Sequence, residues 1–109
     1  MYAIAYRWKL KPGTEAQFER AWAAGTSAIS AEFGGLGSRL HAGEDGFYYA
    51  YAQWPDKETY EKAMETRMHH SDDVAREAYR DAIAEDGFEI LFAGEMVCDL
   101  LQPIPKAGD

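Results

Sequence analysis

Two adjacent histidines, His69 and His70, are the residues of this sequence best suited to acid–base chemistry. An imidazole has a pKa near neutral pH, so either ring could accept a proton from a substrate as a general base. Adjacent side chains point in different directions and no triad of acidic ligands lies nearby, so the pair would make a poor metal site. The other interpretation of both histidines is an exposed polar link between two helical segments.

Four aromatic residues are candidates for binding a flat aromatic substrate: Tyr6, Trp22, Trp54 and Tyr60. Trp54 precedes a proline, which cannot donate a hydrogen bond to a neighbouring strand, so a strand is predicted to end there. Side chains at the carboxyl end of a central strand commonly border a pocket. Aromatic rings at strand or helix spacing also form cores, so ligand stacking and core packing both remain open. Arg39, Arg67 and Arg76 are further candidates, for holding a phenolate or carboxylate.

The first half of the chain predicts a strand, a helix and a hairpin. Large and small residues alternate over residues 2–9, which is typical of a strand with two different faces. Thr14 followed by Gln17 fits a capping box, so a helix with an apolar stripe is expected from there to a cluster of glycines. A second strand is predicted over residues 38–42, and a GEDG turn joins it to a third strand over residues 47–54.

The second half predicts a helix in two pieces and a last strand. Asp56 is the expected N-cap of the first piece, and Ser71 is the expected cap of the second. The Asp-Gly pair at 86–87 should end the second piece. The residues at 88–101 are rich in strand formers, and Gly94 is expected to introduce a bulge or kink.

This order of elements, βαββαβ, predicts an α+β fold of the ferredoxin-like kind, with a four-stranded antiparallel sheet and helices on one side. Residues 1–102 should form one domain, and residues 103–109 an irregular tail. Both faces of the sheet are apolar, and the helices can cover only one of them. We therefore expect a homodimer whose interface buries Phe47, Tyr49 or Tyr51 and part of the last strand.

Composition excludes several classes of function. The chain has 109 residues, a net charge of −8 and a pI near 4.8, which disfavours nucleic acid and anionic membrane surfaces as partners. No apolar run approaches the ~20 residues of a membrane span and no secretion signal is recognisable, so a cytoplasmic protein is predicted. The single cysteine, Cys98, cannot form an internal disulfide and is expected to be a small buried residue.

The KPG sequence at 11–13 and the W-P-D-x-E-x-Y pattern at 54–60 resemble the antibiotic biosynthesis monooxygenase (ABM) family of dimeric α/β barrels. The resemblance spans nearly the whole chain. It implies two sheets packed face to face in a dimer, and a pocket between the sheet and the helices of each subunit. It also implies a monooxygenase that needs no cofactor and oxidises phenolic or hydroquinone substrates with molecular oxygen. Haem-degrading oxygenases belong to the same family.

The functional residues of the family carry over in part. Trp54 and Tyr60 match the tryptophan that ends strand three and the tyrosine of the following helix. Ala50 stands where polyketide-type enzymes have an asparagine. Tyr6 and Met64 stand where the haem-degrading members have an asparagine and a histidine, so haem degradation is disfavoured.

Two functional hypotheses follow from these residues. The first is a cofactor-independent monooxygenase that acts on a small phenolic, hydroquinone or polyketide-like aromatic substrate. The alternative is a non-catalytic dimer of the same fold that binds a small molecule or has a structural role.

Overall fold

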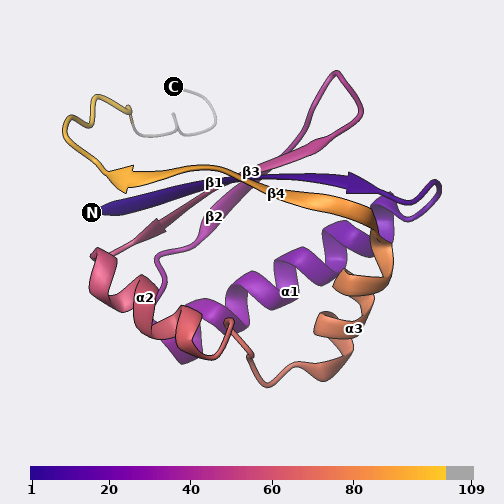
Figure 1. Ribbon diagram of the computed structural model, residues 1–109, viewed down its shortest axis with the longest axis horizontal. Coiled ribbons are helices and arrows are strands. Elements are labelled where there is room, and N and C mark those ends of the chain that lie inside the picture. Colours follow the sequence, from indigo (N-terminus) through magenta and orange to yellow (C-terminus); the bar gives the residue numbers. More distant parts are fainter. Residues whose placement is uncertain (103–109) are drawn as a thin grey trace, which may run out of the picture.

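The computed structural model describes residues 1–102 and shows the predicted ferredoxin-like α+β arrangement (Figure 1). The elements in chain order are β1 (Tyr2–Leu10), α1 (Glu15–Phe33), β2 (Ser38–Ala42), β3 (Tyr48–Trp54), α2 (Lys57–Glu65), α3 (Asp73–Ala82) and β4 (Ile83–Glu95). The predicted irregular tail at 103–109 lies outside the described residues. Within residues 1–102, no helix is both long and apolar enough to cross a membrane.

The four strands form one antiparallel sheet in the order β2-β3-β1-β4, and all three helices cover the same face of it (Figure 1). The pairing of β1 with β3 sets large residues beside small ones, as the alternation predicts. Tyr6 lies opposite Ala50, and Ile4 lies opposite Ala52. Small side chains on β3 thus leave space above the sheet for the large side chains of β1 and of the helices.

The core between the sheet and the helices has two parts, and Tyr6 packs against both of them. One part forms around Trp8 and Phe18, and the other around Ile4 and Trp54. Phe18 and Ile4 are completely buried. Burial of each such side chain contributes about 1.5–3 kcal/mol to the free energy of unfolding. The two clusters therefore provide much of the stability of the packing between the sheet and the helices.

The helix caps differ from the prediction at two of three positions. Asp56 caps α2 as expected, because its Oδ1 accepts the amide hydrogen of Thr59 at 2.7 Å. The predicted capping box at Thr14 is wrong: its hydroxyl donates to the carbonyl oxygens of Lys11 and Ala82 and accepts no amide hydrogen from α1. Ser71 is not the cap of α3 either. Asp72 accepts the Ala75 amide hydrogen at 3.0 Å, since its carboxylate stands one residue closer to the first free amides of the helix.

The last strand begins earlier and ends earlier than predicted. It includes the Asp-Gly pair, where Asp86 adopts a left-handed φ of 55° and the register against β1 shifts, between the pairs Leu10–Ile83 and Trp8–Phe88. Gly94 pairs regularly with Ala3, so the predicted bulge there is wrong; one shift in register falls instead opposite Ala5 and Tyr6. The strand ends at Glu95, and Cys98 beyond it is exposed, contrary to its expected burial.

Candidate functional site

A cavity of about 710 Å³ lies between the sheet and the helices, within the size range of small-molecule sites. Strands β1, β3 and β4 form its floor, and α1, α3 and the link between α2 and α3 form its walls. Aromatic, basic and small residues line it, among them Tyr6, Trp8, Trp22, Gly25, Thr26, Ser30, Trp54, Tyr60, Arg67, Met68, His69, His70, Arg76, Tyr79, Arg80 and Phe88.

All six candidates from the sequence line this one cavity: His69, His70, Trp54, Tyr60, Tyr6 and Trp22. They come from four different parts of the chain, namely β1, α1, the end of β3 with α2, and the link before α3. Trp54 is only 3% exposed and packs edge-on against Tyr60, with ring centroids 5.7 Å apart. It therefore belongs to the core as well as to the cavity wall.

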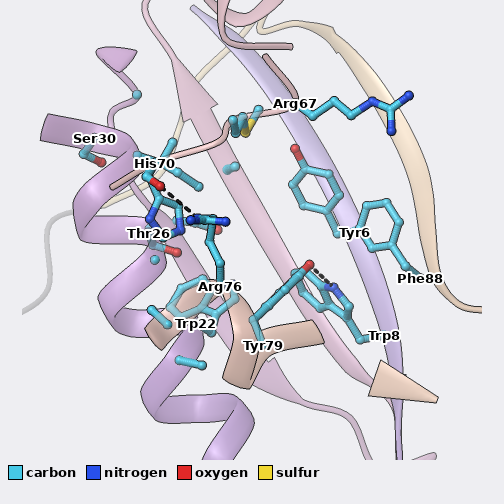
Figure 2. Close-up of a pocket in the computed structure, with 18 of the residues that line it drawn as sticks. Tyr6, Trp8, Trp22, Thr26, Ser30, Arg67, His70, Arg76, Tyr79 and Phe88 are labelled. Atoms are coloured by element: carbon cyan, nitrogen blue, oxygen red, sulfur yellow. Dashed lines mark hydrogen bonds between the residues drawn. The ribbon is translucent and has the colours of Figure 1, made fainter. Parts of the chain in front are cut away.

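Tyr6 stands near the middle of the cavity floor. Its ring stacks on Phe88 of β4 at 5.7 Å, and Figure 2 shows its hydroxyl turned away from Trp8. Burial, together with the neighbouring phenol of Tyr60, raises the pKa of Tyr6 well above its ordinary value. The hydroxyl therefore keeps its proton and is suited to donate a hydrogen bond to a ligand.

Trp8 and Tyr79 close one end of the cavity. The indole Nε1 of Trp8 donates a hydrogen bond to the Tyr79 hydroxyl oxygen at 2.7 Å (Figure 2). Burial raises the pKa of Tyr79 to about 12, and the Trp8 hydrogen bond opposes part of that rise. This pair satisfies the polar atoms of two large side chains within the wall, so it serves packing more than ligand chemistry.

His70 is buried, with 5% of its surface exposed, so the expectation of an exposed polar link fails for this residue. Its Nδ1 accepts the amide hydrogen of Asp72 at 3.2 Å, so a neutral ring carries its proton on Nε2. That nitrogen faces α1, where a Cβ on Gly25 would lie 3.3 Å away. In this tautomer His70 can donate a hydrogen bond through Nε2, whereas its unprotonated nitrogen is already engaged.

The charge on His70 is controlled by its surroundings. Burial is the main cause that lowers the pKa of His70, and the Arg76 guanidinium lowers it further. The carboxylates of Glu32 and Asp72 act in the opposite direction, but the net effect is a lowered pKa. His70 is therefore neutral at physiological pH. His69, in contrast, is exposed at the cavity.

Two residues with left-handed backbone shape the link that carries the histidines. Arg67 and Met68 both have φ of 53°, a conformation that costs non-glycine residues about 1–3 kcal/mol each. The turn reverses the chain after α2 and brings Met68, His69 and His70 to the cavity. Strain of this kind is retained where the surrounding contacts hold it, and here the His70 carbonyl is held by Arg76 Nε at 2.9 Å.

The polar side chains of α1 were missed by the sequence analysis. Thr26 and Ser30 line the cavity on the same helix face as Trp22, at spacings of four residues (Figure 2). Extending the apolar stripe of α1 to small polar residues would have found them.

Among the arginines, Arg67, Arg76 and Arg80 line the cavity, whereas Arg39 pairs with Tyr51 in the sheet and is exposed. Among the described residues, no three His, Cys, Asp or Glu side chains gather as a metal-binding group.

Several proteins of known structure share this fold. A variant of SnoaB, described as a cofactor-independent oxygenase from Streptomyces nogalater, superposes with a TM-score of 0.69 at 17% identity, covering 93% of this chain and 97% of that one. A putative antibiotic biosynthesis monooxygenase from Nitrosomonas europaea gives 0.67 at 15% identity, covering 90% and 100%. At these identities the likeness concerns the fold alone. A comparison with curated protein sequences finds no match. The family model described as antibiotic biosynthesis monooxygenase matches residues 1–85, so the chain belongs to the antibiotic biosynthesis monooxygenase family.

Proposed function

We propose that this protein is a cofactor-independent monooxygenase that oxidises a small phenolic, hydroquinone or polyketide-like aromatic substrate with molecular oxygen. The observation that carries the proposal is the cavity of about 710 Å³, whose floor and walls include Tyr6, Trp22 and Trp54. Aromatic walls suit a flat ring system, and a ligand that fills the cavity would displace water from around its ring. Family membership and the fold shared with SnoaB support the reaction class.

This oxidation requires few functional groups from the protein. A deprotonated phenol or anthrone is a strong enough reductant to pass an electron to oxygen, so a base, an oriented pocket and exclusion of water are sufficient. With anthrone, the ring methylene becomes a carbonyl: one oxygen atom of O₂ enters the product and the other leaves as water with the two methylene hydrogens. Exposed His69 is the candidate base, while His70 and Tyr6 are candidate hydrogen-bond donors to the substrate oxygen.

Oxygen uptake with anthrone and simple hydroquinones tests the proposal. We expect the protein to consume oxygen faster than buffer alone, and His69→Ala to lower turnover by about 10²-fold. His70→Ala should also lower turnover through loss of a donor. His41→Ala removes an exposed histidine that does not line the cavity and is the matched control. Uptake no faster than the uncatalysed rate would rule out the enzyme.

A non-catalytic role as a dimeric small-molecule-binding or structural protein is the second candidate. Two observations favour it: Ala50 offers no polar group on β3, and the unprotonated nitrogen of His70 is engaged by Asp72. Aromatic ligands should then quench the fluorescence of Trp22 and Trp54 without any oxygen uptake. That combination of results would select binding over catalysis.

We also propose that the bare face of the sheet forms a homodimer interface. Tyr51 and Phe92 flank Ala5 there, with the two rings 6.5 Å apart, and Phe92 is 54% exposed. An ion pair between Arg7 and Glu89 lies at one end of the same face. Stable interfaces bury at least ~1,200 Å² in total, and a second copy would cover this apolar surface.

Tyr51→Asp tests the interface by placing an unpaired charge in it. We expect the variant to dissociate or to become insoluble, while the wild type sediments as a dimer at micromolar concentration. A monomeric wild type would contradict the proposal. Unchanged mass and melting temperature in the variant would show that this face is not the one that is covered.

A further inference from the structure

The cavity differs in charge from the rest of the molecule. The chain carries 19 acidic residues against 11 lysines and arginines, yet among the described residues that line the cavity none is Asp or Glu. Three arginines line it instead: Arg67, Arg76 and Arg80. Within the cavity, the arginines and the lack of carboxylates favour an anion over a cation, although the net charge of the chain is −8.

We propose that the ligand of this cavity is an aromatic carboxylate, and that Arg76 binds its carboxylate group. The proposal rests on the proposed function in taking the same cavity as the site, and it names the class of substrate more closely. The carboxylate would lie between the guanidinium and the hydroxyls of Thr26 and Ser30 on α1, with the ring system over Tyr6.

Arg76 is held in place for this role. Its side chain is 20% exposed, and its Nε donates to the His70 carbonyl oxygen at 2.9 Å. Figure 2 shows the side chain rising from α3 with the guanidinium beside His70. Two of the five N–H donors of an arginine are used by His70 and by Asp73, which leaves donors for a planar carboxylate.

The described neighbours of Arg76 include one paired carboxylate, which compensates part of its positive charge. Asp73 pairs with the guanidinium, but its side chain is 82% exposed, and ion pairs to such exposed carboxylates are weak. His70 contributes no charge of its own, because burial and Arg76 keep it neutral. A buried carboxylate on the ligand would therefore be the strongest partner that the guanidinium meets.

Binding of two matched probes tests the inference without requiring turnover. Naphthalene-2-carboxylate and its neutral amide, naphthalene-2-carboxamide, have nearly the same shape and differ in charge. We expect calorimetry to give at least about tenfold tighter binding of the carboxylate, as a hydrogen-bonded charge pair suggests. Equal affinities for the two probes would overturn the inference.

Single-residue variants test whether Arg76 causes the preference for the carboxylate over the amide. Arg76→Gln should weaken carboxylate binding by about tenfold or more and leave amide binding within about twofold. Arg80→Gln, at an exposed position of the cavity rim, should weaken it less. Arg20→Gln removes the same charge from the exposed side of α1 and should have no effect. If Arg20→Gln weakens binding as much as Arg76→Gln, net charge is the cause and the assignment to Arg76 fails.

Two possible complications have separate outcomes. If Arg76→Gln does not fold, because it also loses the bond to the His70 carbonyl, the carboxylate-to-amide ratio of the wild type and of Arg80→Gln still decides the inference. A clear preference for the carboxylate in a protein that shows no oxygen uptake would support the ligand class and reject the monooxygenase. Oxygen uptake without any preference for the carboxylate would support the monooxygenase and reject the ligand class.

Discussion

Replacing His70 by asparagine should make the stability of the protein less sensitive to acid. The imidazole is 5% exposed, and burial is the main cause of its lowered pKa. Arg76 adds to the lowering, and the carboxylates of Glu32 and Asp72 oppose it. The folded protein therefore holds the neutral ring, while the unfolded chain has an ordinary histidine.

The sign of the effect follows from the two protonation states. Above the ordinary pKa of about 6.5 both states are neutral, and His70 makes its full contribution to stability. As the pH falls below that value, the unfolded chain binds a proton that the folded protein does not bind. The free energy of unfolding then falls until the pH reaches the folded pKa, at about 1.4 kcal/mol per unit of pKa difference.

Urea unfolding at about pH 7.5 and about pH 5.5, at one fixed protein concentration, measures this contribution. An asparagine oxygen can also accept the Asp72 amide hydrogen, so His70→Asn should lose about 1 kcal/mol at the higher pH. His70→Ala leaves that amide without a partner and should lose about 1–3 kcal/mol for that reason alone. His41→Asn, at an exposed position, is the control. If His70→Asn loses as much stability as the wild type between the two pH values, the imidazole is not held neutral.

Two substitutions test the packing around the cavity. Gly87→Ala should destabilise the protein by about 1–3 kcal/mol, because a Cβ there would lie 2.5 Å from the Lys9 carbonyl oxygen. Urea titration measures this loss, and an unchanged midpoint would mean that the chain shifts to accommodate the added methyl group. Tyr79→Phe should cost about 1–3 kcal/mol, since the buried indole N–H of Trp8 loses its acceptor. Thermal unfolding checks this value, and an unchanged melting temperature would mean that water replaces the hydroxyl.

Sheet and helix pairing could be predicted because it follows from residue size and spacing. The alternation in β1 and the small residues in β3 give one consistent register, and Tyr6 does lie opposite Ala50. The end of β3 could be predicted as well, since Pro55 removes a donor and Asp56 supplies the next helix cap. In both cases a pattern that can be recognised within a single segment decides the structure.

The details that could not be predicted depend on contacts between distant segments. Thr14 lacks its expected role because the Ala82 carbonyl, at the far end of α3, offers a second acceptor for its hydroxyl. The Asp-Gly pair looks like the end of a helix, yet it lies within β4, because β1 pairs with this strand on both sides of it, at Ile83 and from Phe88 onward. A turn signal read from the sequence cannot weigh such a partner.

In the candidate site, too, some features could be predicted from the sequence and others could not. Each residue could be assigned to a strand, a helix or the link between two helical pieces, and the six histidine and aromatic candidates do line one cavity. The state of His70 could not be assigned, because its burial comes from α1 and its tautomer from the Asp72 amide. The role of Arg76 likewise depends on the His70 carbonyl, which fixes a side chain that would otherwise be a solvated arginine. Sequence spacing predicts that such groups lie on the same face. Their chemistry depends on which of their donors and acceptors already form hydrogen bonds within the folded protein.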